Sequence, residues 1–529
     1  MARSTASMSV STGISRVTGF IRNWAMAYAI GATFFSSSYI VANNIPNMIY
    51  ELVAGGVLSS VFIPIFIERW KAHGDEDASR LASSVLNVTL IALGLVALVA
   101  TVWAEPFVRT QTFTMEPARA ANAVFFFRFF AIQIVFYGAA AIFTGVLNSH
   151  RHFVAPAAGP IFNNLVVIAT MFSYPHIADP AMARTVLAVG TTLGVVAQMA
   201  ACVPPLIKMR WRWQPRIDWH HPALRRLYAK MVPVLGYVIV NLAGVSFRNA
   251  ISFTASTRPA GAGPSALQYA WMFYQLPYGV FAVALATAIF PELSEHAARK
   301  DWAAFKLQFT RGLRANAALV IPAAAMLVAL AYPLSKLYRT GAFSAEAVPL
   351  VAGVLATWGL GLFSFAAYMY TMKAFYSLQD TRTPMFTNIA ATGIQVGLYW
   401  VLTVGAFGWK GIGLPGIPAG DAISYSLHLL ALLLILRMRL GSFDLRATAW
   451  TIARVALAGL GGGLLAWGIV QVTPGLAHVR LGFVLQLLGG GVVGLAATYA
   501  LARLMRVHEM EAAAGMIRGV GKRLFRAAS

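Results

Sequence analysis

The sequence predicts an all-α polytopic membrane protein, and three observations carry that prediction. Of its 529 residues, 58% are hydrophobic and only 11% are charged. A water-soluble protein carries roughly 25% charged residues. The mean hydropathy is +0.67, and the apolar runs are long enough to cross a bilayer as helices, without the alternation typical of membrane strands. Soluble multidomain and disordered classes are therefore excluded.

Six spans are predicted in the first part of the chain, because each apolar run reaches the roughly 20 residues that a bilayer requires. A basic loop follows between Lys208 and Lys230, with arginines and tryptophans interleaved. We interpret it as a cytoplasmic belt on anionic lipid headgroups rather than a nucleic-acid patch. The sequence thus predicts an N-terminal lobe at 1–208 and a basic cytoplasmic linker at 209–229. The six spans lie near 14–34, 38–68, 82–104, 122–148, 154–174 and 183–207.

Eight further spans bring the predicted total to about fourteen transmembrane helices. Two equal sets of six predict two lobes around a central cationic cavity, as in many transporters. We expect a C-terminal lobe at 230–438, a further helix pair at 439–505 and a basic cytoplasmic tail at 506–529. These spans lie near 230–256, 266–292, 313–335, 347–377, 383–405, 413–436, 449–471 and 481–504.

The distribution of basic residues predicts the orientation. With the N-terminus inside, the inner loops carry 28 Lys and Arg residues and the outer loops carry 8. Basic residues collect on the cytoplasmic side of membrane proteins, so both termini are predicted to be cytoplasmic in a bacterial inner membrane. This rule also accounts for the net charge of +23 without a nucleic-acid partner. The single Cys202 excludes a disulfide framework, and no cleavable signal peptide is expected.

Ionisable side chains inside the spans are the first candidates for function, because burying them in lipid is costly. Arg16 and Arg22 lie on the first helix, Arg128 on the fourth and Arg248 in the middle of the seventh. Guanidinium groups bind phosphate oxygens bidentately, so these residues indicate an anionic ligand. The alternative is that they snorkel to the membrane surface, which is hardest for Arg248.

Two carboxylates also fall within spans. Glu51 lies in the second helix, and Asp421 lies in the twelfth within a run of glycines and prolines from Gly413 to Gly420. An aspartate beside an interrupted helix is typical of cation or proton coupling. Pairing with an intramembrane arginine, or a place near the outer interface, are the alternatives. We also expect interruptions at Asn43–Asn47 and at Gln275–Pro277.

Catalytic motifs are absent from the sequence. It contains no HExxH, GxSxG or P-loop pattern and no acidic pair suited to metal-dependent glycosyl transfer. We therefore expect no enzyme activity, cofactor or metal, and an ion gradient or membrane potential as the source of energy.

Ser15–Arg22 reads SRVTGFIR, which resembles S-R-V-x-G-F-x-R, the opening motif of the MurJ (MviN) family of lipid II flippases. The segment from Ile45 to Pro64 contains IPN and GGVLSSVFIP, which resembles I-P-N…E-G-A-L-S-x-A-F-V-P and includes Pro46, Gly55 and Gly56. The stretch VLN, which ends at Asn148, resembles the family's motif at the corner between helices 4 and 5. Phe375–Pro384 reads FYSLQDTRTP, similar to F-Y-x-x-x-D-T-R-T-P, with Asp380 and Pro384 in matching places.

The resemblance implies the fourteen-helix fold of the multidrug/oligosaccharidyl-lipid/polysaccharide exporter superfamily. It also implies that the final helix pair forms a groove for a lipid tail. Lipid II then enters from the inner leaflet, its pyrophosphate binds cavity arginines, and the lobes rock to release it outside. Arg16 and Arg22 match the family's two arginines on helix 1, and Asn44, Asn47 and Glu51 lie by its helix 2 motif.

Two departures weaken the match. Tyr50 and Met272 stand where the family has arginines on helices 2 and 8, and Asn44 replaces a basic residue. Arg248 and Arg128 are candidates to replace the lost charge. The acidic sodium ligands of helices 7 and 11 are also missing, whereas Asp421 falls near the family's helix 12 ligand.

Several alternatives therefore stay open. The chain could be a transporter of the same fold for another lipid-linked glycan, a drug or cation antiporter, or a transport-inactive scaffold that recruits cell-wall enzymes. Lipid II flipping for peptidoglycan synthesis, and hence for cell shape, is the prediction we favour. The expected partners are a lipid-linked glycan, membrane phospholipids and cell-wall synthesis enzymes.

Overall fold

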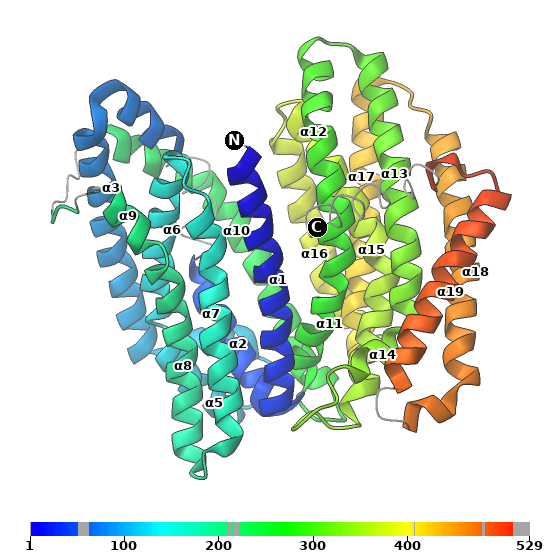
Figure 1. Ribbon diagram of the computed structural model, residues 1–529, viewed down its shortest axis with the longest axis horizontal. Coiled ribbons are helices and arrows are strands. Elements are labelled where there is room, and N and C mark those ends of the chain that lie inside the picture. The colour runs from blue at the N-terminus through cyan, green and yellow to red at the C-terminus, as the bar shows by residue number, and fades with distance from the viewer. Residues whose placement is uncertain are drawn as a thin grey trace. The chain divides into compact units, whose positions relative to one another are not determined.

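The computed structural model describes residues 2–50, 63–209, 211, 213–215, 222–406, 408–478 and 482–510. The chain divides into two compact units. Unit 1 comprises Met1–Ser265 with Thr340–Ser344, and unit 2 comprises Ala266–Arg339 with Ala345–Ser529. Figure 1 labels the helices of both units. The units divide after Ser265, and the lobe boundaries expected from the sequence stay a prediction.

Unit 1 is built from the first ten α-helices and two short 3₁₀ turns. Gly74, with φ of +80°, marks a kink inside α3 that separates two helical stretches. α5 and α6 form a bent pair, with an angle of 44° across the break. The elements are α1 (Ala2–Ile30), α2 (Phe34–Tyr50), α3 (Ile63–Val102), α4 (Ala104–Thr112), η3 (Pro117–Ala120), α5 (Ala121–Phe130), α6 (Gln133–Ser149), α7 (Val154–Ser173), η4 (Tyr174–His176), α8 (Pro180–Ala200), α9 (Val203–Lys208) and α10 (Pro222–Ala255).

Within unit 1, α1 packs along α7, and α7 packs in turn against α8. The Asn164 side chain on α7 joins the first pair, because its Nδ2 donates to Thr18 Oγ1 at 3.0 Å and to the Ser15 carbonyl at 3.3 Å. A second core lies between α3, α6 and α9, and includes the single cysteine, Cys202, which is 2% exposed. The hydrogen bonds from Asn164 thus fix the face that α1 turns to α7.

The segment Thr340–Ser344 belongs to unit 1 although it is flanked in sequence by unit 2. It lies against the turn between α1 and α2. Phe343 in this segment is 3% exposed. The chain therefore crosses from one unit to the other and back within a few residues.

Unit 2 contains the remaining helices and one short hairpin. A π-helical turn, η5, lies between α11 and α12. Gln275–Pro277 are still α-helical, so the expected interruption appears only as a change of helix type directly after Pro277. The elements are α11 (Gly263–Pro277), η5 (Tyr278–Ala282), α12 (Val283–Ala298), α13 (Trp302–Ala329), α14 (Ala331–Lys336), α15 (Ala347–Ser377), α16 (Arg382–Thr403), β1 (Gly405–Ala406), β2 (Trp409–Lys410), α17 (Gly416–Leu440), α18 (Leu445–Val472), η6 (Pro474–His478) and α19 (Gly482–Leu504).

In unit 2, α15 packs against α13 and α17, and α16 packs against α17. The last two helices, α18 and α19, run side by side (Figure 1). Their approach depends on glycine: a Cβ built at Gly462 would lie 2.3 Å from the Gly494 carbonyl oxygen. Side chains at this point would force the helices apart.

The described part of the chain confirms a helical membrane protein. Ten of its helices are long and apolar enough to cross a membrane, or eleven when the bent pair α5–α6 is included as one span. The total of fourteen stays a prediction.

Two local expectations were wrong. α2 runs unbroken from Phe34 to Tyr50 with Pro46 inside it, because proline removes one backbone hydrogen bond without necessarily ending a helix in a packed setting. The glycine and proline run does not interrupt the helix of Asp421 either. Pro415 caps α17, and the helix then continues to Leu440.

Candidate functional site

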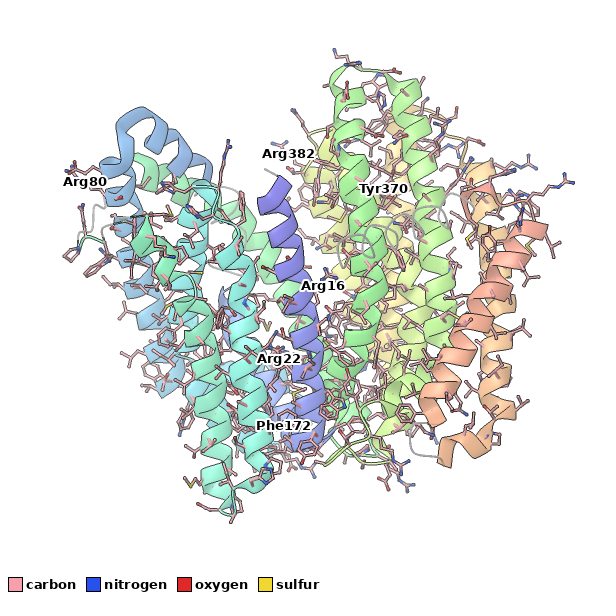
Figure 2. All side chains as sticks on the ribbon, viewed as in Figure 1. Arg16, Arg22, Arg80, Phe172, Tyr370 and Arg382 are labelled. Atoms are coloured by element: carbon pink, nitrogen blue, oxygen red, sulfur yellow. The ribbon has the colours of Figure 1, made fainter. Side chains whose placement is uncertain are left out.

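Arg16 and Arg22 both lie on α1 (Figure 2). Because they are six residues apart, their side chains leave the helix about 120° from each other. Arg16 is exposed and Arg22 is half-buried. Arg22 lies close enough to Tyr39 on α2 to interact with it electrostatically. The two guanidinium groups therefore occupy different surroundings along the same helix.

Arg248 and Arg128 also belong to unit 1, on α10 and α5. Arg248 is half-buried, and its Nε is a buried atom without a hydrogen-bond partner among the described residues. Its neighbour Asn249 is buried and donates to Gln111 Oε1 on α4 at 2.8 Å. Gln111 Nε2 in turn donates to Ser246 Oγ at 2.6 Å, so α10 is held firmly on α4 at this level. Arg128 is exposed near the bend between α5 and α6.

None of these four arginines forms an ion pair with an acidic residue in the described part of the chain. The acids that the structure does pair are bound to other arginines. A cationic side chain on a helix predicted to span the membrane, with no described counter-ion, is suited to an anionic ligand. All four arginine candidates fall in unit 1, whereas Asp421 falls in unit 2.

The asparagines of the second helix form a polar stretch inside α2. Asn44 and Asn47 are half-buried, and Asn43 has a buried Oδ1 that no described group donates to. Pro46, between them, is buried. Glu51, Gly55 and Gly56 lie outside the described residues.

The later family motifs lie at helix ends. Asn148 is half-buried in the last turn of α6, and Pro384 is buried in the first turn of α16. Asp380 precedes α16, and its Oδ1 accepts from the backbone N–H groups of Arg382 and Thr383 at 3.0 Å each. Its Oδ2 accepts from Arg439 on α17, which also donates to Thr383 Oγ1 at 2.7 Å. The motif thus clamps the end of α17 to the start of α16.

This clamp sets the protonation of Asp380. Burial alone raises the pKa of the carboxyl. Hydrogen bonds from Thr383 and Arg439, together with the Arg439 charge, outweigh burial and hold the pKa below its ordinary value of 3.8. Asp380 is therefore ionised in the folded protein at neutral pH.

Asp421 is 2% exposed and lies early in α17. Its Oδ2 accepts from Trp358 Nε1 on α15 at 2.7 Å. Its Oδ1 accepts from Gln395 Nε2 on α16 at 2.5 Å and from the Tyr399 hydroxyl. These three donors are electrically neutral: an indole, an amide and a phenol.

Sequence reasoning missed all three partners of Asp421. Gln395 and Tyr399 are four residues apart in one span, which places them on the same helix face and is a usable signal. Trp358 gives no such signal, because only the packing of α15 against α17 brings its indole to the carboxyl.

An apolar cavity of about 470 Å³ lies inside unit 2. Its walls come from α13, α14, α19 and the end of α11 with its π-helical turn. Apart from the Tyr499 side chain, its lining residues are apolar or glycine. A cavity of this character accommodates hydrocarbon chains.

The helices able to cross a membrane, the arginines without a described acidic partner and the apolar cavity are together typical of polytopic helical transporters. A solved structure titled lipid II flippase MurJ, inward closed conformation, superposes with a TM-score of 0.75 over 94% of this chain and 99% of that one, at 20% identity. An inward-facing multidrug resistance MATE family transporter of the MOP superfamily gives 0.68 over 82% of this chain and 98% of that one, at 14% identity. Both likenesses show the fold.

Sequence comparison gives the particular family. The family profile described as lipid II flippase MurJ matches residues 26–484. The lipid II flippase MurJ of Burkholderia cenocepacia is 31% identical over 71% of this chain and 73% of its own length. The probable lipid II flippase MurJ of Vibrio cholerae serotype O1 is 29% identical over 88% of this chain and 90% of its own length. The chain belongs to the MurJ family.

Proposed function

We propose that this protein flips lipid II, a polyprenyl-pyrophosphate-linked peptidoglycan precursor, from the inner to the outer leaflet by alternating access. Membership of the MurJ family supports the substrate class. The observation that carries the proposal is the set of unit 1 arginines without a described acidic partner. Guanidinium groups at membrane depth suit a pyrophosphate, because each can form paired hydrogen bonds to its oxygens.

The substrate-binding set comprises Arg16, Arg22, Arg248 and Arg128, with Asn44, Asn47 and Glu51 as neutral and acidic neighbours. Arg22 and Arg248 contribute most, since both are half-buried. Arg16 and Arg128 are both exposed; Arg16 matches the family's opening motif, whereas Arg128 lies beside a helix bend without such a match and contributes least. In this assignment, Arg248 replaces the positive charge of the two family arginines whose positions hold Tyr50 and Met272 in this chain.

The apolar cavity of unit 2 receives part of the polyprenyl chain. Leu327, Leu330 and Leu334 supply one wall, and Leu487 and Leu495 supply another. The polyprenyl chain comes from bilayer hydrocarbon rather than from water, so van der Waals packing in the cavity, not the hydrophobic effect, holds it there. Of the helix pair predicted at 439–505, α19 contributes lining residues to this cavity and would thereby act on the lipid tail.

The protein works in the bacterial cytoplasmic membrane with both termini inside, as the distribution of basic residues predicts. An ion gradient or the membrane potential drives the cycle, with Asp421 as the ion-coupling candidate. Cell-wall synthesis enzymes that use the flipped precursor are its expected partners, alongside the surrounding phospholipids.

A second candidate function is transport of another lipid-linked glycan. Met272 favours it, because a neutral methionine stands where the family has an arginine. Met272 is 7% exposed, and its sulfur accepts from Gln275 Nε2 at 3.1 Å. Any lipid-linked pyrophosphate still requires the arginines, so the two candidates differ in the sugar and not in the anion.

Complementation tests the proposal. The resident lipid II flippase of a bacterium is depleted, and the wild-type chain, Arg16→Ala or Arg80→Ala is expressed in its place. Arg80 is the control, because it is exposed and paired with Glu76 one helical turn away. We expect rescue by the wild type and Arg80→Ala, and loss with Arg16→Ala. Failure of a well-inserted wild type would instead favour the other glycan.

A further inference from the structure

Two buried ionisable side chains lie on the face of α17 that packs against α16. Asp421 is 2% exposed and His428 is 3% exposed. Seven residues separate them, which is close to two helical turns, so both project from the same side at about 10 Å spacing along the axis. Family membership does not assign a role to His428.

Side chains and backbone of α16 hold both groups. Gln395 and Tyr399 donate to Asp421, and the Thr387 hydroxyl pairs with His428 Nε2 at 3.1 Å. Between them, Ser424 Oγ donates to the backbone carbonyl of α16 at Ala391, at 2.9 Å. We call this row the α16–α17 seam: Thr387, Gln395 and Tyr399 on α16 with Asp421, Ser424 and His428 on α17.

The neighbouring helices add phenol groups to this seam. Tyr368 on α15 stacks on His428 at 4.8 Å and on Tyr425 at 5.3 Å between ring centroids. Tyr274 on α11 and Tyr425 on α17 interact electrostatically with Asp421. Phenols ordinarily titrate near pH 10, far above the working range. Among the described groups named here, a carboxyl and an imidazole are therefore the two that can change charge during transport.

We propose that the α16–α17 seam is a proton-binding site in which Asp421 takes up the coupling proton and His428 is the second protonatable group. The inference rests on the proposed function, since it names the ion that drives the flippase. Asp421 lies nearer the end of α17 that is predicted to face outward, and His428 lies nearer the cytoplasmic end. A proton moving into the cell would therefore meet Asp421 first and His428 second.

The donors around Asp421 favour a proton over a metal cation. The indole N–H of Trp358 can only donate, and it points at Oδ2 at 2.7 Å. Hard cations require several oxygen ligands, and the described residues contain no group of three or more His, Cys, Asp or Glu side chains suited to a metal. A proton needs one carboxyl oxygen, and the seam provides it.

Proton binding changes the contacts of α16 in a defined way. One proton from the aqueous phase adds to Oδ1 of Asp421, which neutralises one buried negative charge and breaks no other covalent bond. Oδ1 then donates as well as accepts: the Tyr399 hydroxyl turns to accept its proton, and the Gln395 amide still donates to the same oxygen. The proton later leaves to water on the other side, either directly or after a stay on the imidazole of His428.

An infrared pH titration of the purified full chain in lipid tests the site without any substrate. We expect a carbonyl stretch of a buried protonated carboxyl that titrates in the wild type and disappears in Asp421→Asn. Tyr399→Phe, which keeps the carboxyl but removes one donor to its charged form, should shift the midpoint of this band to higher pH. Ser426→Ala is the control, since its hydroxyl is exposed and pairs with Ser364. A band that persists unchanged in Asp421→Asn overturns the inference.

Flipping in proteoliposomes then tests coupling, with lipid II as the probe. We expect a pH gradient to accelerate flipping by the wild type and Ser426→Ala, but not by Asp421→Asn, and His428→Gln to lose most of the acceleration. Stimulation by a sodium gradient at equal pH, or an unchanged response in Asp421→Asn, overturns the inference while the flippase function stands. A titrating band in a wild type that flips no lipid II refutes the proposed substrate instead.

Discussion

The backbone N–H of Ala342 donates a 2.9 Å hydrogen bond to the carbonyl oxygen of Tyr28 near the end of α1. Two glycines make this contact possible. Gly31 has φ of +62°, and a Cβ there would lie 2.3 Å from the Ala342 oxygen. Gly341 has φ of +53°, and a Cβ there would lie 2.2 Å from the Tyr28 oxygen. Glycine is therefore required on both sides of the hydrogen bond.

Substituting either glycine should destabilise unit 1. We expect Gly31→Ala and Gly341→Ala each to lower the free energy of unfolding by at least ~1–3 kcal/mol, because a positive φ and a backbone clash act together. Thermal unfolding in detergent and amide hydrogen exchange at Ala342 measure the effect. The matched control is Gly94→Ala in α3, which has nothing within 4 Å of a new Cβ. Equal melting temperatures for all three variants would contradict the prediction.

Arg248 should matter more than Arg128 for transport. We expect Arg248→Ala to abolish complementation at normal membrane levels, since its guanidinium is half-buried on α10, next to the Asn249–Gln111 hydrogen bond that joins α10 to α4. Arg128→Ala should weaken complementation less, because its side chain is exposed. Arg248→Lys keeps the charge but loses the bidentate geometry, so partial activity is the expected result.

The same assay supplies the control for this pair. Arg299→Ala removes an exposed cation that pairs with Glu295 on the same helix, and it should leave complementation unchanged. Full activity in both Arg248→Ala and Arg128→Ala would refute the idea that these arginines replace the missing charge.

Filling the apolar cavity should impair flipping according to lipid length. Gly491 lines the cavity, and a Cβ there would meet only Leu330 Cδ1, at 3.8 Å. Gly491→Leu therefore enters free space and displaces part of a substrate chain, which loses van der Waals contacts of about 0.1–0.2 kcal/mol each. Flipping rates with long-chain and short-chain polyprenyl substrates measure this effect. Only the long chain should be affected.

Gly489→Leu is the matched control, because Gly489 is on the same helix, outside the cavity lining, and has nothing within 4 Å. If Gly491→Leu slowed both substrates equally, the cavity would not bind the lipid tail.

The Asp380 clamp should make stability depend on acid pH. The pKa of Asp380 is lower in the folded state than in the unfolded chain, where it is near 4. The ionised carboxylate therefore stabilises the fold fully above the unfolded pKa, and this stabilisation is lost as the pH falls through the folded pKa. We expect Asp380→Asn to have a lower free energy of unfolding than the wild type at neutral pH. The difference should be on the order of 1 kcal/mol, because Arg439 is partly exposed and solvent screens the pair. The gap should close below about pH 4. Glu76→Gln should show no such gap.

Much of the helical framework follows from hydropathy alone. The predicted span 347–377 coincides with α15, and 154–174 and 383–405 lie within two residues of α7 and α16. These spans are bounded by polar loops that hydropathy detects. By contrast, α10 begins at Pro222 rather than near 230, because its first turns are amphipathic and cannot be told from a surface loop.

The candidate site was predictable only in part. Arg22, Arg248 and Asp421 stand out in the sequence, because a charge in an apolar run is visible without a fold. The Trp358 indole is 63 residues from Asp421, and their contact depends on how α15 and α17 pack. The continuity of α2 through Pro46 was missed for the same reason, since packing decides whether a proline ends a helix.

The position of Cys202 has a practical consequence for following motion. It is the single cysteine of the chain and is 2% exposed, enclosed by residues such as Ile142, Val146 and Leu206. A water-soluble maleimide has no accessible native sulfhydryl to attack. Any surface position changed to cysteine would therefore carry a spin label or fluorophore alone, and pairs of such labels would report distances between the two units without first removing a native residue.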